Sequence, residues 1–304
     1  MQIYLPIAEL SVNVFLALGM GGAVGFLSGL FGVGGGFLMT QLLILVGIPA
    51  PVAVATSANQ IIGPSLLAFL THWRRGNVDF RMGTILLVGG VAGSSFGVWL
   101  FSLLRGIGQV DLVIKLSYVT LLAVLGSLML SESIRAMLRR RRRALTKRHQ
   151  HYWIHGLPLK MRFRRSRLYI SVLPSVGVGL VVGVLSGILG VGGGFVMVPA
   201  MIYLLGMPTA VVVGTSLLQI IFVTANVTVL QAATLQTVDV VLALLLMTGG
   251  VVGAQIGSGF GTRMRGEHLR GLLALMVLAV CAQLAFDLGV TPDDIYSLAA
   301  VVHR

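Results

Sequence analysis

The stretch that decides the fold occurs twice: residues 25–37 read GFLSGLFGVGGGF, and residues 183–195 read GVLSGILGVGGGF. Ten of the thirteen positions are identical at an offset of 158 residues. A run of three glycines breaks a helix, because glycine readily adopts the left-handed conformations that other residues avoid. The apolar residues around each triplet therefore predict a helix, a break and a second helix in both copies.

The likeness continues downstream of both copies, in the same order. GIPAPVAVATS at 47–57 matches GMPTAVVVGTS at 206–216, and Asp79 matches Asp239. The same spaced glycines, Gly-Gly-x-x-Gly-x-x-x-Gly, follow each aspartate. Three collinear matches indicate an internal duplication, which is a recurrent design of secondary transporters.

The composition indicates that this duplication lies in a membrane. Apolar residues make up 56% of the 304 residues, charged residues only 10%, and the mean hydropathy is +0.96. Because soluble domains carry about 25% charged residues, these values exclude a soluble enzyme, a disordered protein and a secreted disulfide scaffold. Cys281 is the single cysteine, so no intrachain disulfide can form. No Lys or Arg precedes Arg74, so a signal peptide is not predicted and the first apolar stretch should remain in the mature protein.

The apolar stretches predict an all-α, polytopic membrane protein. A membrane-spanning helix needs about 20 apolar residues, and eight windows of that kind lie near 12–32, 52–71, 82–103, 112–130, 171–190, 211–230, 238–260 and 269–288. Two shorter apolar pieces, near 36–47 and 195–206, each follow a glycine triplet. Twelve helical residues reach only about 18 Å, so we expect these pieces to be re-entrant or strongly tilted. Each repeat then holds three full spans plus a glycine-broken helix pair, and the odd number of net crossings predicts that the second repeat is inverted.

The positive charges predict the orientation. Of the 22 Lys and Arg residues, 13 lie between Arg135 and Arg167, and basic blocks beside apolar spans usually stay in the cytoplasm. With that block inside, the loops around 72–81 and 263–270 are also inside, and 19 of the 22 basic residues share this side. We therefore expect a multi-pass protein of the cell (inner) membrane with both termini outside.

The expected organisation has four parts. They are a first transmembrane repeat at 1–130, a basic cytoplasmic loop at 131–170, a second, inverted repeat at 171–290, and a short C-terminal tail at 291–304. The basic loop is interpreted as a solvated segment that meets anionic lipid headgroups. Nucleic acid is not an expected partner, and the sequence does not predict an oligomeric state.

These motifs resemble the TauE/SafE sulfite exporter family (the TSUP permeases). The doubled G-x-x-S-G-x-x-G-x-G-G-G-F motif and the G-x-P and T-S elements after it carry the resemblance over roughly residues 12–290. The resemblance implies export of sulfur-containing anions such as sulfite or sulfonates. One departure is that the second copy has Pro199 five residues after Gly194, as the family pattern usually does, whereas the first copy has Thr40 and Gln41 there.

The glycine triplets have two compatible interpretations. Glycine allows the backbone to turn and helices to approach closely. A helix that begins at a glycine break inside a membrane also exposes backbone N–H groups and its positive dipole end, which attract anions without a costly buried Lys or Arg. The candidate anion-binding residues of this kind are Gly34, Gly35 and Gly36, and Gly192, Gly193 and Gly194.

A second group of candidates consists of neutral polar residues inside the predicted spans. Hydroxyls and amides can donate hydrogen bonds to sulfonate oxygens while staying uncharged. The alternative is hydrogen bonding between helices, worth about 0.6 kcal/mol per bond in membranes. The candidates are Thr56, Ser57, Asn59 and Gln60, with their repeat equivalents Thr215, Ser216 and Gln219, and Asn226 further along.

No catalytic group, cofactor or metal is predicted. No His, Cys, Asp or Glu cluster has metal-ligand spacing, and no βαβ unit surrounds the glycines. Asp79 and Asp239 are expected to cap the helices that follow them, with a proton relay as the alternative. The spaced glycines are expected to be packing faces, and Ser28 and Ser186 to bond backbone groups freed by the breaks. The histidines all fall in predicted loops or the tail: His72, His149, His151, His155, His268 and His303.

Taken alone, the sequence favours a secondary transporter that exports a small anion by alternating access between two inverted repeats. An anion channel is one alternative, because channels also tolerate broken helices and neutral polar linings. A membrane scaffold that docks partners through the basic loop is another. The sequence does not identify the coupling ion.

Overall fold

The chain folds into helices of one repeating order. The computed structural model describes residues 2–7, 10–31, 34–106, 110–141, 160–163, 165–166, 168–235, 238–261 and 266–289. The first half holds α1 (Val14–Phe31), α2 (Gly36–Leu45), α3 (Ala50–Arg74), α4 (Phe80–Gly106) and α5 (Val110–Arg141). The second half holds α6 (Val172–Leu189), α7 (Gly194–Tyr203), α8 (Thr209–Leu235), α9 (Val240–Gly261) and α10 (Gly266–Gly289). Both short helices, α2 and α7, have ten residues, so Pro199 does not change the length of the second one.

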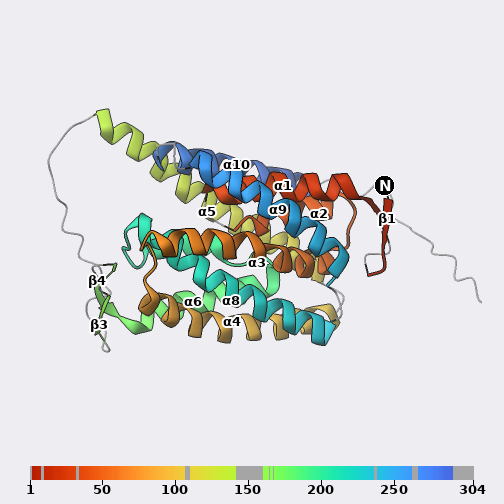
Figure 1. Cartoon of the computed structure of the whole chain (residues 1–304), viewed down its shortest axis with the longest axis horizontal. Helices are drawn as coiled ribbons and strands as arrows, with labels where there is room; N and C mark the ends of the chain where they lie inside the picture. The colour runs from red at the N-terminus through yellow and green to blue at the C-terminus, as the bar shows by residue number, and fades with distance from the viewer. Residues whose placement is uncertain are drawn as a thin grey trace, which may run out of the picture.

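Two short hairpins were not predicted, and in this respect the all-α prediction is wrong. Strand β1 (Gln2–Leu5) pairs antiparallel with β2 (Leu10–Asn13), and β3 (Lys160–Phe163) pairs antiparallel with β4 (Leu168–Ser171). The β1 hairpin and the β3–β4 hairpin lie at opposite ends of the long helices (Figure 1). The segment expected to be a basic loop therefore contains the end of α5 and a hairpin.

Several helices are long and apolar enough to cross a membrane. Among the described residues six meet this condition, in α3, α4, α5, α6, α8 and α9. The apolar parts of α1 (Val14–Leu30) and α10 (Ala274–Phe286) are shorter. The polytopic helical class is confirmed, whereas the expected count of eight full spans stays a prediction.

The outward faces of the long helices carry large apolar side chains. Soluble monomers rarely expose apolar surface on this scale, so these side chains indicate contact with lipid. Among the more exposed are Val88, Phe96, Trp99, Val181, Phe222, Val229, Val252 and Phe286.

The two halves are interleaved, because the first helix of each half packs against the fourth helix of the other. Helix α1 packs on α9, and α6 packs on α4. The spaced glycines lie at both contacts: a Cβ at Gly93 would be 2.9 Å from Leu180 Cα, and one at Gly253 would be 2.7 Å from the backbone nitrogen of Phe26. The prediction that these glycines form packing faces is confirmed.

The contacts also define the relative direction of the helices. Residue numbers rise together along α4 and α6, where Gly89, Gly93 and Gly97 face Val176, Leu180 and Val184. They also rise together along α1 and α9, where Gly21, Gly25 and Gly29 face Leu246, Gly250 and Ala254. Both exchanged pairs therefore run parallel.

Equivalent helices of the two halves run antiparallel where they meet. A Cβ at Gly126 of α5 would lie 2.9 Å from the Leu278 side chain of α10, and the Cys281 Sγ donates to Val119 O at 3.4 Å. Rising numbers in α5 thus meet falling numbers in α10. Helices α3 and α8 behave alike, since His72 lies beside Gly214 while Ala58 packs with Val227.

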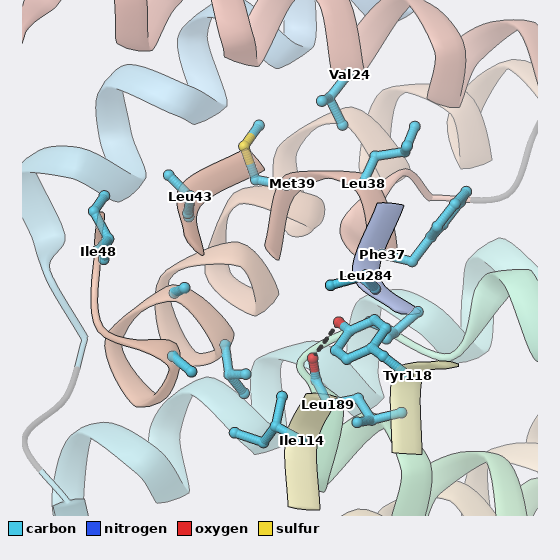
Figure 2. Packing of buried hydrophobic residues seen from close by; sticks show 14 of the residues in the cluster. Val24, Phe37, Leu38, Met39, Leu43, Ile48, Ile114, Tyr118, Leu189 and Leu284 are labelled. Carbon is cyan, nitrogen blue, oxygen red and sulfur yellow. Dashed lines mark hydrogen bonds between the residues drawn. The ribbon is translucent and has the colours of Figure 1, made fainter. Parts of the chain in front are cut away.

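The short helix α2 is buried in the largest apolar cluster of the described chain. Phe37, Leu38, Met39 and Leu43 of α2 pack there with residues of α5 and α6 (Figure 2). The Tyr118 hydroxyl of α5 donates to the carbonyl of Leu189, the last residue of α6, at 2.7 Å. This bond satisfies a carbonyl that the second glycine break leaves without a helical partner.

Candidate functional site

The two glycine breaks face each other at the centre of the molecule. Phe37 and Phe195, which end the two copies of the motif, stack with ring centroids 4.8 Å apart and planes at 27°. A Cβ at Gly36 would lie 2.7 Å from the carbonyl oxygen of Val191, so backbone meets backbone at this point. The predicted helix breaks are confirmed, and the two breaks are in contact with each other.

The breaks depend on left-handed backbone conformations. The φ angles are 88° at Gly34, 65° at Gly35, 71° at Gly192 and 74° at Gly193. Gly35 and Gly193 are the N-cap residues of α2 and α7, and neither helix has a side-chain cap. No capping side chain therefore binds the amides of the first turn, as the predicted anion binding at these helix N-termini requires.

Apolar side chains lie beside the glycine breaks. A Cβ at Gly34 would lie 3.6 Å from Ile61 and 3.7 Å from Ile220, and one at Gly192 would lie 2.9 Å from Ile61. Ile61 and Ile220 occupy related positions in α3 and α8. Anion binding at the glycine triplets stays a prediction, and it requires these two side chains to move.

Thr56 and Thr215 tie each half to the other. The Thr215 hydroxyl oxygen accepts a hydrogen bond from the amide of Asp79 at 3.0 Å, and the Thr56 hydroxyl oxygen accepts one from the amide of Asp239 at 3.4 Å. Both threonines are fully buried. The structure thus gives these two candidates a role in holding the halves together, and a substrate contact remains a prediction.

Ser57 links three segments around the breaks. Its Oγ lies 2.6 Å from the Oγ of Thr40 in α2 and donates to the carbonyl of Gly190 at 3.3 Å. Ser216 makes only a bond within its own helix, to the Val213 carbonyl at 3.0 Å. The two serines match in sequence but not in contacts, because Thr40 is replaced by Val198 in the second copy.

Gln60 and Gln219 are buried beside the spaced glycines of α9 and α4. Gln60 lies against Gly250 of α9, and Gln219 lies against Gly90 of α4. The Oε1 atoms of both, and the Nε2 of Gln219, have no hydrogen-bond partner. Buried polar groups without partners are costly, so these amides are available to a ligand. Asn59 is half-buried on the same helix as Gln60.

Asp79 and Asp239 cap the following helices, as predicted. The Oδ1 of Asp79 accepts from the amide of Met82 at 3.2 Å, and the Oδ1 of Asp239 accepts from that of Leu242 at 3.0 Å. Their other oxygens differ. Asp79 Oδ2 accepts from the amide and the hydroxyl of Ser166, at 3.1 and 2.7 Å, whereas Asp239 Oδ2 is buried without a partner. A proton relay through either carboxylate stays a hypothesis.

A cavity of about 410 Å³ lies between α1, α3, α8 and α9. Thr71, His72 and Arg75 lie at the end of α3, where Thr71 and Arg75 are exposed, and Ser65 lies deeper and is 2% exposed. Ser28, in α1, also lines the cavity, and its Cβ is 3.0 Å from the place of a Cβ at Gly35. The cavity therefore leads from the surface to the neighbourhood of the first glycine break.

None of the thirteen residues predicted to bind substrate lines this cavity. The polar residues that do line it, including Ser65, His72, Arg75 and Gln255, were missed. His72 was expected in a loop, but α3 continues to Arg74 and carries it in its last turn. The signal that could have found it is the helical spacing Ser65-x6-His72, which puts both residues on one face of α3.

The region that is equivalent to this cavity by the sequence repeat is filled. Val98, Val223 and Val227 pack there with Ala58 in one buried apolar cluster, which we call the valine plug. The Nδ2 of Asn226 donates to the Oγ atoms of Ser94 and Ser95, at 2.9 and 3.1 Å. Gln231, the repeat equivalent of His72, donates from Nε2 to the Gly187 carbonyl at 3.3 Å. Of two equivalent regions between the halves, one is thus open and the other is filled.

Other expectations have mixed outcomes. Ser186 does not bond a backbone group, because its buried Oγ has no partner. Within the described ranges, no three His, Cys, Asp or Glu side chains come together as metal ligands. Residues 142–159, Arg263, Arg265 and the tail at 291–304 lie outside the described residues, and the expectations for them are untested.

Comparison with known families identifies the family of this chain. The sequence profile of the sulfite exporter TauE/SafE family matches residues 17–284. The chain belongs to the TauE/SafE family. It is accordingly a multi-pass membrane transporter and not an enzyme.

Relatives support the same assignment for this TauE/SafE protein. A probable membrane transporter protein of Xylella fastidiosa is 31% identical over 272 residues, which cover 88% of this chain and 93% of the relative. The probable membrane transporter protein YjnA of Bacillus subtilis is 30% identical over 273 residues, which cover 88% and 97%. No solved structure matches the chain.

Proposed function

We propose that this TauE/SafE protein is a secondary transporter that exports a small sulfur-containing anion by alternating access between two inverted repeats. The observation that carries the proposal is that the cavity is open whereas the equivalent region is filled by the valine plug. A transporter that works by alternating access has its site open to one side and closed to the other. An open channel would need a continuous path through both halves.

The helix directions support inverted repeats. Two copies related by an axis in the membrane plane bring equivalent helices together in antiparallel orientation. The contacts of α5 with α10 and of α3 with α8 have this direction. The exchanged contacts of α1 with α9 and of α6 with α4 are those that such an axis would repeat. We also propose the boundaries 1–130 and 171–290 for the two repeats.

The substrate class follows from the family and from the lining of the cavity. The family is described as sulfite exporters, and the cavity is lined by hydroxyls, an amide, an imidazole and a guanidinium, with no Asp or Glu among the described residues that line it. Such a surface favours an anion over a cation. A volume of about 410 Å³ is within the roughly 300–1,000 Å³ of small-molecule sites, so an organosulfonate fits as well as sulfite.

The orientation that we propose puts the cavity mouth and residues 131–170 in the cytoplasm and both termini outside. The β3–β4 hairpin lies at one end of the helices and the N-terminal hairpin at the other, as this orientation requires (Figure 1). The hairpin also touches the mouth, where Arg165 donates to the carbonyl of Gly76 at 3.2 Å. An anion that leaves the cell would therefore enter from the basic side.

The first experiment is flux in proteoliposomes. Purified protein should move radiolabelled sulfite or methanesulfonate with saturable kinetics, with and without a pH gradient, while protein-free liposomes should not. Absence of flux for every sulfur oxyanion tested, with folded protein, would count against the proposal. Unitary currents in planar bilayers, at rates far above transporter turnover, would instead favour the channel.

The second experiment tests orientation. In a Cys281→Ala background, cysteines replace Tyr4 in β1 or Arg162 in β3, both of which are exposed. In intact cells an impermeant thiol reagent should label the variant at position 4 and spare the one at position 162, and both should react in lysed cells. Reversed labelling would overturn the orientation and the direction of export with it.

A further inference from the structure

The cavity contains two buried polar atoms that the protein leaves without partners. The Oγ of Ser65 and the Nδ1 of His72 are both buried and make no hydrogen bond, and both residues line the cavity. An unsatisfied buried polar atom costs about 1–3 kcal/mol, so native proteins seldom keep two of them in one place without a ligand or water to bind. Both residues lie on α3, seven positions apart and therefore on one face of the helix.

The charges around the cavity are of one sign. Among the described residues that line the cavity, Arg75 is the charged one and none is acidic. Arg165 of the connecting hairpin lies beside the mouth, bonded to Gly76. The carboxylate of Asp79 is buried, accepts hydrogen bonds from Ser166 and Met82, and does not line the cavity. A positive potential at the mouth of a cleft with low-dielectric walls concentrates small anions there.

We propose that Arg75, His72 and Ser65 form the first binding site for the exported anion, at the open end of the pathway. Arg75 at the surface attracts the anion and holds it with a charge-assisted hydrogen bond. The His72 Nδ1–H and the Ser65 hydroxyl donate to its oxygens deeper in the cavity. This site lies before the glycine breaks, because Ser28 separates the cavity from Gly35. The inference rests on the proposed function, since it names where the anion enters.

The alternative is that Arg75 and His72 merely stabilise the end of α3. Basic residues at a helix C-terminus interact favourably with its dipole, and Arg74, the last residue of α3, is next to the C-cap residue Arg75. Arg74, however, does not line the cavity. Ser65 lies three turns inside the helix, where a dipole effect does not explain an unpaired hydroxyl.

The decisive variants are Arg75→Gln and its matched control Arg74→Gln. Each removes one positive charge from the same helix end, so they differ only in the contact with the cavity. Sulfite binding to detergent-solubilised protein, measured by calorimetry, should weaken about tenfold or more in Arg75→Gln, which is the size expected for a lost charge-assisted bond. It should change less than about twofold in Arg74→Gln. In proteoliposomes, KM for sulfite should rise in Arg75→Gln in the same proportion.

Ser65→Ala provides a readout that a structural role would not produce. Because the hydroxyl has no partner in the protein, its removal should leave the melting temperature unchanged or raise it, while sulfite binding weakens several-fold. Ser57→Ala on the same helix should instead lower the melting temperature, since that hydroxyl is bonded to Thr40 and Gly190. Methanesulfonate should compete with sulfite for the site, whereas neutral ethylene glycol should not.

The outcomes separate this inference from the proposed function. If the wild-type protein transports sulfite and the two arginine variants respond alike, the first binding site is wrong and the transporter proposal stands. If the wild-type protein binds sulfite through Arg75 but moves no anion, the site is supported and the transporter proposal fails. If Ser65→Ala loses stability together with binding, the hydroxyl is structural and its role here is overturned.

Discussion

The cavity and the valine plug lie at equivalent positions between helices of both halves, yet their side chains differ. Ala68 and Ser258 line the cavity where Val227 and Val98 fill the other half. The glycine contacts between helices are the same on both sides. At these two positions the side chains of the plug are larger, while the close glycine contacts are shared.

Hydrogen bonds follow the same division. On the filled side Asn226 bonds to Ser94 and Ser95, and Gln231 bonds across to Gly187. On the open side Leu67 replaces Asn226, and His72 replaces Gln231 and has an unpaired nitrogen. The closed side is held by bonds that the open side cannot make. The repeat equivalents thus differ in sequence at the positions that line the cavity and the plug.

The largest expected effect comes from the framework that the halves share. In Gly183→Leu, a variant of α6, the added Cβ would lie 2.8 Å from the backbone nitrogen of Ser94. Since backbone cannot move aside as a side chain can, we expect a loss of more than about 3 kcal/mol, or no folded protein. Fluorescence-detected size exclusion with a thermal ramp measures it.

The control is Gly177→Leu in the same helix, where nothing lies within 4 Å of the added Cβ. This variant should stay within about 0.5 kcal/mol of wild type. Gly25→Leu and Gly19→Leu in α1 repeat the test in the other half. Equal melting temperatures for Gly183→Leu and Gly177→Leu would contradict the close contact of α4 with α6.

The next effect distinguishes the two capping aspartates. Asp79→Asn replaces an oxygen that accepts two bonds from Ser166 with an amide facing two donors, and hydrogen bonds to charged groups contribute about 1.5–3 kcal/mol. We expect a loss of about 2–3 kcal/mol in unfolding experiments. Asp239→Asn should cost less than about 1 kcal/mol, because that oxygen has no partner.

Ser166→Ala tests the same contact from the hairpin. Combined with Asp79→Asn, it should add little further loss, since the two residues share one interaction. Additive losses would mean that the hairpin and Asp79 stabilise the fold independently. Equal losses from the two aspartate variants would remove the difference between the halves at this position.

The positions of the helices along the chain could be predicted from the sequence because they follow from local signals. The window near 238–260 became α9 at Val240–Gly261, since an apolar run of that length with Asp239 before it specifies a capped helix. The glycine motifs likewise determine breaks wherever they occur. The hairpin of β3 and β4 was missed because four-residue strands carry almost no periodicity.

The cavity could not be predicted, for a different reason. Ser65, Arg75 and Gln255 are far apart in the chain or at helix ends, and none belongs to the repeated motifs. Thr56 and Thr215 were recognised as equivalent, but their bonds to the amides of Asp239 and Asp79 join residues over 130 positions apart. Repetition identifies what the two halves share, whereas the open site depends on where they differ.

A smaller effect is expected from exchanging the lining itself. The double variant Ala68→Val and Ser258→Val copies the plug into the cavity, and sulfite flux should fall about tenfold, which corresponds to about 1.4 kcal/mol in the barrier. The fold should be unaffected, because the added methyl groups enter empty space. Flux in proteoliposomes and a thermal melt measure both effects.

The reverse exchange is its matched partner. Val98→Ser with Val227→Ala gives the plug the residues of the cavity. This variant should make a cysteine introduced at Val223 reactive toward thiol reagents from the outside, in a background without Cys281. Unchanged flux in the first variant, with unchanged reactivity in the second, would mean that side-chain volume at these positions does not determine which side is open.

The smallest effect concerns the bonds that hold the plug. Asn226→Leu copies Leu67 and removes the donor to Ser94 and Ser95, and a bond between membrane helices contributes about 0.6 kcal/mol. That loss hardly affects folding, but in the proposed alternating-access transporter it would act on the equilibrium between closed and open plug. Because two such bonds are lost, we expect a cysteine at Val223 to react about sevenfold faster when Asn226→Leu is added, at a nearly unchanged melting temperature. Because Ser94→Ala with Ser95→Ala removes the same bonds from the other helix, it should produce the same acceleration alone and no more in combination. Acceleration by the asparagine variant but not by the serine pair would show that leucine opens the plug by crowding, and that the hydrogen bonds do not hold it closed.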